Sequence, residues 1–201
     1  LVQKKDIRKS EIIEHPSYVN ELAHYIMQDL KEFRKIQGDD TLGGMIICET
    51  SEQARRLYDV FQEEWQKYQP KPIKIKLPDG TFVVGEPEVD YKSKYRPLKA
   101  GIILHDTDDK ETRKQTVKDF KKNMTVDILI VFNMLLTGFD APRLKRLYFG
   151  RKLKDHNLLQ AITRVNRPYP GMRYGFVIDF ADIKRNFKET NEAYLQELNR
   201  F

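Results

Sequence analysis

Hydrophobic positions along this chain of 201 residues fall into two alternating patterns. Short uninterrupted apolar runs alternate with stretches in which apolar residues recur every three or four positions. The first pattern is typical of strands buried on both faces, and the second of helices that bury one side. The runs that we expect to be strands span residues 45–48, 101–104, 126–132, 147–149 and 176–178. This alternation predicts an α/β fold with an open parallel sheet and helices on both faces.

Polar residues mark the starts of the expected helices. A helix over residues 18–37 follows Ser17 as a cap, and Gly38 ends it. Thr50 and Asp108 begin the next two, each with the partner that a capping box requires three residues later. A further helix is expected from about residue 156 to residue 166.

One segment has a different pattern, in which apolar and polar residues alternate on both sides of Pro78–Asp79–Gly80. Strict alternation around a turn sequence predicts a β-hairpin, placed in an insertion of about residues 71–95. Asp79 with Asp90 and Lys92 also has the outline of a nuclease metal site. The hairpin turn already accounts for Asp79, so we assign no metal site there.

Charge is unevenly distributed along the chain. Lys and Arg number 36 against 30 Asp and Glu, for a net charge of +6, but residues 143–173 hold nine basic side chains and one acid, Asp155. The nine are Arg143, Lys145, Arg146, Arg151, Lys152, Lys154, Arg164, Arg167 and Arg173. Such a field attracts polyanions, although a basic run can also be a merely solvated face.

Other features of the composition indicate where the protein works. No run of apolar residues approaches the roughly 18 that a membrane helix needs, and the first residues do not resemble a signal peptide. The single cysteine, Cys48, lies in an apolar run and cannot form an internal disulfide. We therefore expect a cytoplasmic protein with no membrane association.

Two polar constellations are candidates for chemistry. In residues 137–142, Thr-Gly-Phe-Asp-Ala-Pro, the glycine permits close approach of a ligand and Asp140 can accept from a ribose hydroxyl. Gln160, Arg164 and Arg167 share one face of the expected helix, because they are separated by four and three residues. Two guanidinium groups on one stripe suit a multiply charged phosphate. Open α/β sheets bind ligands at the carboxyl ends of their strands, where we expect this site.

Together these segments resemble motifs V and VI of superfamily-2 helicases, in their usual order. The longer run from Leu136 to Arg167, followed by Tyr174–Gly175 and Asp179, is similar to the R subunit of type I restriction enzymes. The resemblance implies the second RecA-like lobe of a DNA motor, over residues 43–180. Residues 1–42 would be a helical segment leading from the preceding lobe, and residues 181–201 a helix leading out.

The resemblance also implies roles for individual residues. Arg164 and Arg167 match the arginines that reach the γ-phosphate of ATP held by the first lobe. The residues expected on the nucleotide side are Gly138, Asp140 and Gln160, and those expected to contact DNA are Thr50, Ser51, Thr137 and Arg143. Two departures from the wider superfamily are that Thr137 replaces an arginine, and that Thr163 and Asn166 replace the glycines of motif VI.

The sequence contains neither a Walker A loop nor the acidic motif that holds magnesium. ATP and Mg²⁺ are therefore expected as cofactors of the parent, an ATP-dependent type I deoxyribonuclease, with Mg²⁺ held by its first lobe. This lobe alone is expected to bind neither and to be inactive. Expected partners are duplex DNA, the preceding lobe of the same polypeptide, and methyltransferase and specificity subunits. Alternatives are a motor lobe of another superfamily-2 helicase, as in nucleotide excision repair, or a non-catalytic nucleic-acid-binding module.

Overall fold

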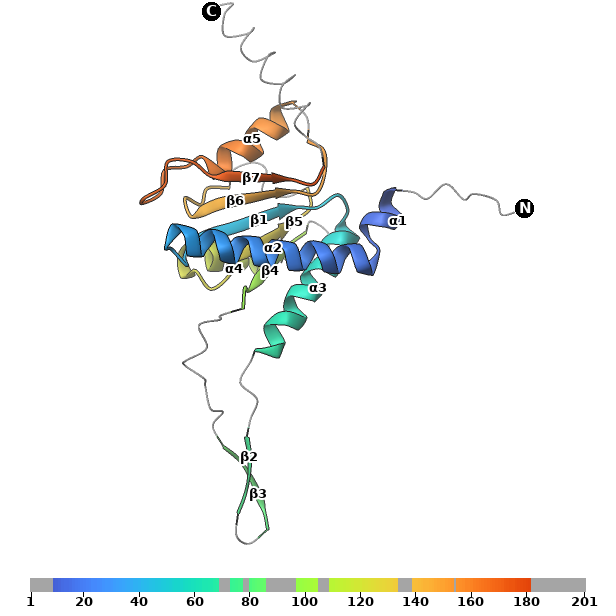
Figure 1. The fold of residues 1–201 in the computed structure, drawn as a ribbon, viewed down its shortest axis with the longest axis vertical. Helices are drawn as coiled ribbons and strands as arrows, with labels where there is room; N and C mark the ends of the chain where they lie inside the picture. The colour runs from blue at the N-terminus through green and yellow to red at the C-terminus, as the bar shows by residue number, and fades with distance from the viewer. Residues whose placement is uncertain are drawn as a thin grey trace, which may run out of the picture.

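The structure is a computed structural model, and it describes residues 9–68, 73–77, 80–85, 97–104, 109–133, 139–153 and 155–181. Its main sheet has five strands, all parallel, in the order β4-β5-β1-β6-β7 (Figure 1). They are β1 (Gly43–Ile47), β4 (Ala100–Ile103), β5 (Ile128–Val131), β6 (Leu144–Phe149) and β7 (Phe176–Asp179). Each apolar run predicted to be a strand contributes one of them, so the predicted open parallel sheet is confirmed.

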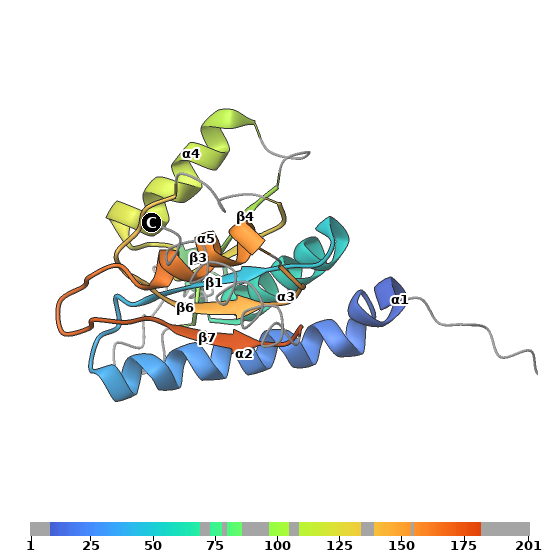
Figure 2. The same ribbon diagram turned by 90° about the horizontal axis from the view of Figure 1, so that it is seen from above.

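Helices cover both faces of this sheet (Figure 2). The helices are α1 (Lys9–Ile13), α2 (Pro16–Gln37), α3 (Ser51–Lys67), α4 (Lys110–Lys118) and α5 (Asp155–Val165), and a π-helical turn (Asp119–Asn123) extends α4. One apolar cluster joins α2 and α3 to one face, and a second joins the π-helical turn and α5 to the other. Burial of both faces explains why the strands read as continuous apolar runs.

Helix α2 is part of the lobe. Seven of its apolar side chains are buried against the sheet and α3, among them Ile26 and Leu30, which are fully buried. The helix begins at Pro16, two residues earlier than predicted, because its cap is His15, which accepts from the Ser17 amide through Nδ1 at 3.2 Å, and not Ser17. Gly38 ends the helix with a φ of 67°. Helix α2 therefore belongs to the same core as the sheet, and the domain boundary between residues 42 and 43 stays a prediction.

The starts of α3 and α4 are capped by side chains. Thr50 accepts from the amide of Gln53 through its hydroxyl at 3.0 Å, as the sequence predicted. Helix α4 is capped by Asp109, which accepts from the amide of Thr112 at 2.7 Å. The predicted cap, Asp108, lies outside the described residues.

The predicted hairpin is present. Strands β2 (Ile73–Lys76) and β3 (Phe82–Gly85) pair antiparallel as a separate sheet, and Gly80 adopts a φ of +85° in the turn. The rest of the insertion, including Asp79 and Asp90 to Lys92, lies outside the described residues, and so does the segment beyond residue 181, where a helix was predicted. Within the described part of the chain, no three His, Cys, Asp or Glu side chains are grouped so as to hold a metal. Nor does any helix described there combine the length and apolar character needed to cross a bilayer.

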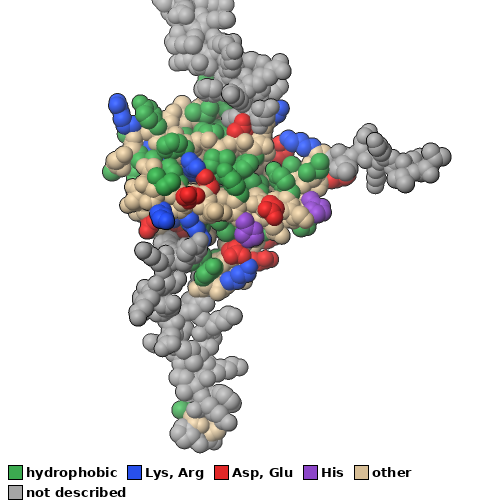
Figure 3. Space-filling view, in the orientation of Figure 1, with side chains coloured by type: hydrophobic (Ala, Val, Ile, Leu, Met, Phe, Trp, Pro, Cys, Tyr) green, Lys and Arg blue, Asp and Glu red, His purple; other side chains and the backbone are tan. Residues whose placement is uncertain are grey.

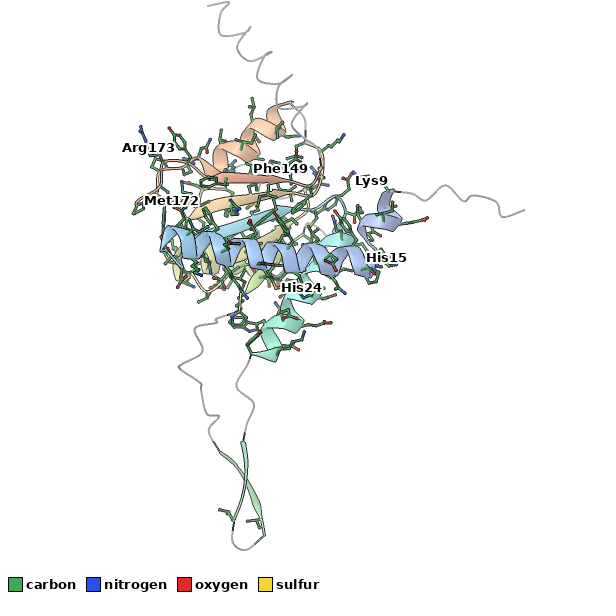
Figure 4. The ribbon with its side chains drawn as sticks, in the orientation of Figure 1. Lys9, His15, His24, Phe149, Met172 and Arg173 are labelled. Atoms are coloured by element: carbon green, nitrogen blue, oxygen red, sulfur yellow. The ribbon has the colours of Figure 1, made fainter. Side chains whose placement is uncertain are left out.

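Parallel strands give the sheet two distinct edges. We call the edge where the strands end the carboxyl edge and the edge where they begin the amino edge. Figure 4 shows Lys9 and His15 on the side of the carboxyl edge, and Met172 and Arg173 on the side of the amino edge. The helices that connect parallel strands run back across the sheet, so a helix that starts at one edge ends at the other.

Candidate functional site

Two arginines at the end of α5 reach the same short segment. Arg167 lies with its Nε 3.5 Å from Oδ1 of Asp140, and both side chains are about half exposed, at 47% and 55%. Arg164 donates from Nη1 to the carbonyl of Phe139. The structure therefore brings together the two constellations that the sequence singled out, the helical arginine pair and the glycine-aspartate segment.

The segment that carries Asp140 is anchored by its neighbours. Phe139 and Ala141 are buried, at 4% and 2% exposure, whereas Asp140 is exposed. The ring of Phe139 packs 6.0 Å from that of Phe120, and the carbonyl of Ala141 accepts from the amide of Leu144 at 2.9 Å. Because Phe139 and Ala141, one on each side of Asp140, are buried, the carboxylate of Asp140 points outward, next to the arginines.

The cluster has an excess of positive charge. Burial is the main cause that lowers the pKa of Arg164, and the neighbouring Arg167 lowers it further, while Asp140 opposes both. Because the guanidinium of an arginine stays protonated in proteins, the site holds two cations and one anion. An added anionic group would relieve the repulsion between the two arginines.

Gln160 lies one turn before Arg164 on α5 and is partly buried. Its backbone carbonyl accepts from the hydroxyl of Thr163 at 2.9 Å. Thr137 and Gly138, predicted to contact DNA and nucleotide, lie outside the described residues. Their roles, like those of Gln160, stay predictions.

The cluster lies at the amino edge of the sheet. Lys145, the second residue of β6, extends its Nζ to the carbonyls of Val165, at 3.3 Å, and Arg167. The last turn of α5 is therefore beside the start of β6. Our expectation of a site at the carboxyl edge was wrong for these residues, because α5 begins at that edge and runs back across the sheet before it presents its arginines.

The carboxyl edge holds the other predicted contacts, Thr50 and Ser51, at the start of α3. Ser51 is the first residue of the helix and is partly exposed. The hydroxyl of Thr50 donates to Oε1 of Glu14 at 2.6 Å while it accepts from the amide of Gln53. Nearby, Arg151 donates to the side-chain oxygen of Asn133. The Thr50 hydroxyl, which we expected to contact DNA, therefore donates its hydrogen bond to a carboxylate of the same chain.

Arg143 is buried, with 2% of its surface exposed. Its guanidinium donates to the backbone carbonyls of Thr41, Phe120 and Val126. We therefore withdraw the expected DNA contact at Arg143, because its donors are directed at the protein's own backbone.

The basic run of residues 143–173 is not one surface. Besides Arg143, Lys145 is fully buried and Arg146 forms a two-pronged ion pair with Asp29. Successive strand residues point to opposite faces, which splits a run that is continuous in sequence. Figure 3 shows basic and acidic side chains intermixed on the face formed by α2 and β7.

Two residues of these sites were missed by sequence reasoning, Lys145 and Glu14. Lys145 stands among apolar residues in the run Leu-Lys-Arg-Leu-Tyr-Phe, which was the available signal that it is buried. Glu14 has no comparable signal, since its contact with Thr50 joins residues 36 positions apart.

Residues 90–182 match the family model described as type I restriction enzyme subunit R domain 3. The chain is 31% identical over 209 residues to the type I restriction enzyme MjaVIIIP endonuclease subunit of Methanocaldococcus jannaschii, covering 96% of this chain and 19% of that protein. It is 47% identical over 77 residues to the MjaVIIP endonuclease subunit of the same organism, covering 38% and 7%. It is 41% identical over 80 residues to the SauCOLORF180P endonuclease subunit of Staphylococcus aureus, covering 39% and 8%. The chain thus spans less than a fifth of the length of these relatives.

Among solved structures, domain 2 of the DEAD-box helicase Mss116p, bound there to an RNA duplex, is similar in fold. The TM-score is 0.54 with 16% sequence identity, over 89% of this chain and 56% of that one. At this identity the likeness shows the fold alone, and it agrees with the sheet order and helical layers described above. By its residues 90–182 and its relatives the chain belongs to the type I restriction enzyme R-subunit family, and its fold is that of a RecA-like helicase C-terminal lobe.

Proposed function

We propose that this chain is the second motor lobe of an ATP-dependent DNA translocase in a type I restriction-modification system. In this proposal Arg164 and Arg167 act on ATP that is bound by a first lobe elsewhere in the parent polypeptide. The observation that carries the proposal is the cluster at the amino edge, where the guanidinium groups of Arg164, in the last turn of α5, and Arg167, two residues beyond the helix, stand beside the exposed carboxylate of Asp140.

The ion pair between Arg167 and Asp140 is weak enough for Arg167 to exchange the carboxylate for a phosphate. Its Nε is 3.5 Å from the Asp140 carboxylate, and both groups are about half exposed, so the ion pair contributes little stability, at most about 1 kcal/mol. A γ-phosphate offers more negative charge and more acceptor oxygens than a carboxylate. When the lobes close, Arg167 would turn to the phosphate, and Asp140 would be free to accept from the ribose.

Arg164 complements Arg167 as a less mobile charge. One of its nitrogens donates to the carbonyl of Phe139, whose ring is buried, so the guanidinium is tied to the core. Arginine fingers are worth on the order of 10³-fold or more in rate in phosphoryl-transfer enzymes. In this proposal the first lobe binds the β-phosphate and Mg²⁺, and we expect the second lobe alone, which is this chain, to be inactive.

DNA contacts belong, in this proposal, to the opposite edge. Thr50 and Ser51 would meet phosphates of duplex DNA near the start of α3, where backbone amides and the helix dipole favour anions. Thr137, which lies outside the described residues, stays a DNA contact proposed from the sequence. Closure around ATP at one edge would then move a DNA contact at the other, and each cycle of hydrolysis would step the duplex. The methyltransferase and specificity subunits would be partners of the parent, and its nuclease would lie outside this lobe.

The test is Arg167→Ala in the full-length R subunit, assembled with its methyltransferase and specificity subunits. We expect the DNA-stimulated ATPase rate to fall on the order of 10³-fold. Arg173→Ala is the matched control, because Arg173 is an exposed arginine of the same basic run that is not one of the two arginines assigned to ATP. An Arg167→Ala enzyme that hydrolyses ATP at near the wild-type rate would contradict the proposal. Persisting salt-dependent DNA binding would then favour the non-catalytic module.

A further inference from the structure

Lys145 is a fully buried lysine, and no acidic side chain among the described residues pairs with it. It is the second residue of β6, and its side chain lies between the sheet and the end of α5. Its ammonium contacts two backbone carbonyls, that of Val165 at 3.3 Å and that of Arg167. Among the described residues it forms no ion pair, so these carbonyls are what offset its charge.

The end of a helix is a suitable place for a buried cation. The last carbonyls of a helix lack intrahelical partners and carry a partial negative charge, and an ammonium offers three donors to them. Burial lowers the pKa of Lys145, which reflects the free energy required to remove the charged form from water. The contacts of the Lys145 ammonium with the two carbonyls must offset this cost, so we infer that they hold the backbone at the end of α5 firmly in place.

That backbone belongs to Arg167 itself. Helix α5 ends at Val165, and Asn166 and Arg167 follow outside the helix. A second restraint on this bend lies at the surface, where the side-chain oxygen of Asn166 accepts from the amide of Gly175 at 3.4 Å. The contact with Lys145 is therefore the buried restraint on the Arg167 main chain.

We propose that Lys145 is a positioning residue for the arginine pair, which clamps the end of α5 to β6 and so fixes the direction in which Arg167 leaves the helix. This rests on the proposed role of Arg167 toward ATP. Lys145 itself touches no substrate. A guanidinium must meet a phosphate within hydrogen-bond distance, and a displacement of about 1 Å can cost on the order of 10²-fold in rate.

The experiment compares Lys145→Met, Arg167→Ala and the double variant in the full-length R subunit with duplex DNA and ATP. Lys145→Met should lower kcat by tenfold to roughly a hundredfold, with a smaller change in KM for ATP. The double variant should be no slower than Arg167→Ala alone, because Lys145 acts through Arg167. Tyr148→Phe is the matched control: it removes a partly buried hydrogen bond from the β6 residue Tyr148 to Asp29 on α2. It should leave kcat within about twofold while it lowers Tm.

Two results would overturn this proposal and leave the proposed function in place. In the first, Arg167→Ala loses ATPase activity but Lys145→Met keeps the wild-type kcat. In the second, the losses in kcat of the two single variants multiply in the double variant. If Arg167→Ala itself stays active, the proposed function fails and the positioning role fails with it. Should Lys145→Met not fold, Lys145→Gln retains two amide donors. Its kcat should fall between those of the wild type and Arg167→Ala, and adding Arg167→Ala should again slow it no further than Arg167→Ala alone.

Discussion

The two edges of the sheet are held together by different interactions. At the amino edge the links are buried charges. Of the five buried polar side chains among the described residues, four lie there: Arg34, Asp127, Arg143 and Lys145. At the carboxyl edge the links are partly exposed, as in the pairs Lys9 with Glu49, at 2.5 Å, and Thr50 with Glu14, at 2.6 Å.

The difference concerns how easily each edge can rearrange. A buried charge that loses its partners costs several kcal/mol, whereas an exposed pair contributes at most about 1 kcal/mol and exchanges its partner readily. The amino edge is therefore rigid behind the arginines that we assign to ATP, and the carboxyl edge can release Thr50. A motor lobe needs both properties, a fixed catalytic geometry and a contact that makes and breaks with each cycle.

The largest effect that we predict concerns the amino edge. Asp127 accepts from Arg34 at 2.8 Å and from the backbone amide of Lys99 at 2.8 Å. Asp127→Ala would leave the buried guanidinium of Arg34 without its carboxylate, and we expect the free energy of unfolding to fall by about 3–5 kcal/mol. Urea denaturation of the chain measures this. Glu111→Ala, which breaks an exposed pair with Lys114, is the control and should cost under about 0.5 kcal/mol. Equal losses in the two variants would remove the contrast between buried and exposed links.

Much of the fold is predictable from the sequence because its strands are buried on both faces. Such strands leave uninterrupted apolar runs, and the capped helices between them leave polar starts, as at Thr50. Cap positions were less secure. The cap of α2 is His15 and not Ser17, and that of α4 is Asp109, because several polar residues near each helix start are able to act as the cap.

The candidate site was predictable in membership but not in position. The three-residue spacing of Arg164 and Arg167 identifies them as neighbours, because helical geometry is local and Arg167 follows directly on the last turn of α5. The edge that they reach follows from the parallel sheet, because α5 starts at the carboxyl edge and runs back, but our expectation considered only the loops after the strands. Which basic residues are buried depends on the register of β6. Arg143 and Lys145 therefore read as surface charges in the sequence, although both are buried.

A smaller effect is expected at the carboxyl edge. If Thr50 and Ser51 contact DNA, the carboxylate of Glu14 competes with a DNA phosphate for the Thr50 hydroxyl. The negative charge of this carboxylate also repels the phosphate. Glu14→Gln should tighten binding of duplex DNA by a factor of about two to five, equivalent to roughly 0.3–1 kcal/mol near a helix start. Fluorescence anisotropy with labelled duplex at low salt measures the change.

The control for this comparison is Glu21→Gln, which removes the same charge from an exposed position on α2. General electrostatic attraction would be raised equally by both variants, so only an excess for Glu14→Gln reports release of Thr50. If the two variants bind alike, or Glu14→Gln binds more weakly than the wild type, the carboxyl edge is not the adjustable DNA contact that we infer.

The smallest effect concerns the second capped helix at the carboxyl edge, α4. The hydrogen bond from the Thr112 amide is the main cause that holds the pKa of Asp109 below its ordinary value of 3.8. A carboxylate whose pKa is lower in the folded state stabilises that state above its unfolded pKa, and this contribution is lost as the pH falls through the folded pKa. Exchange of the Thr112 amide should therefore become less protected under acid conditions, below about pH 4. Asp109→Asn keeps a capping oxygen but does not titrate, so its protection should lack this acid-dependent loss. The same acid dependence in both proteins would mean that the start of α4 is held by something other than its cap, and that exchangeable polar contacts do not govern this edge.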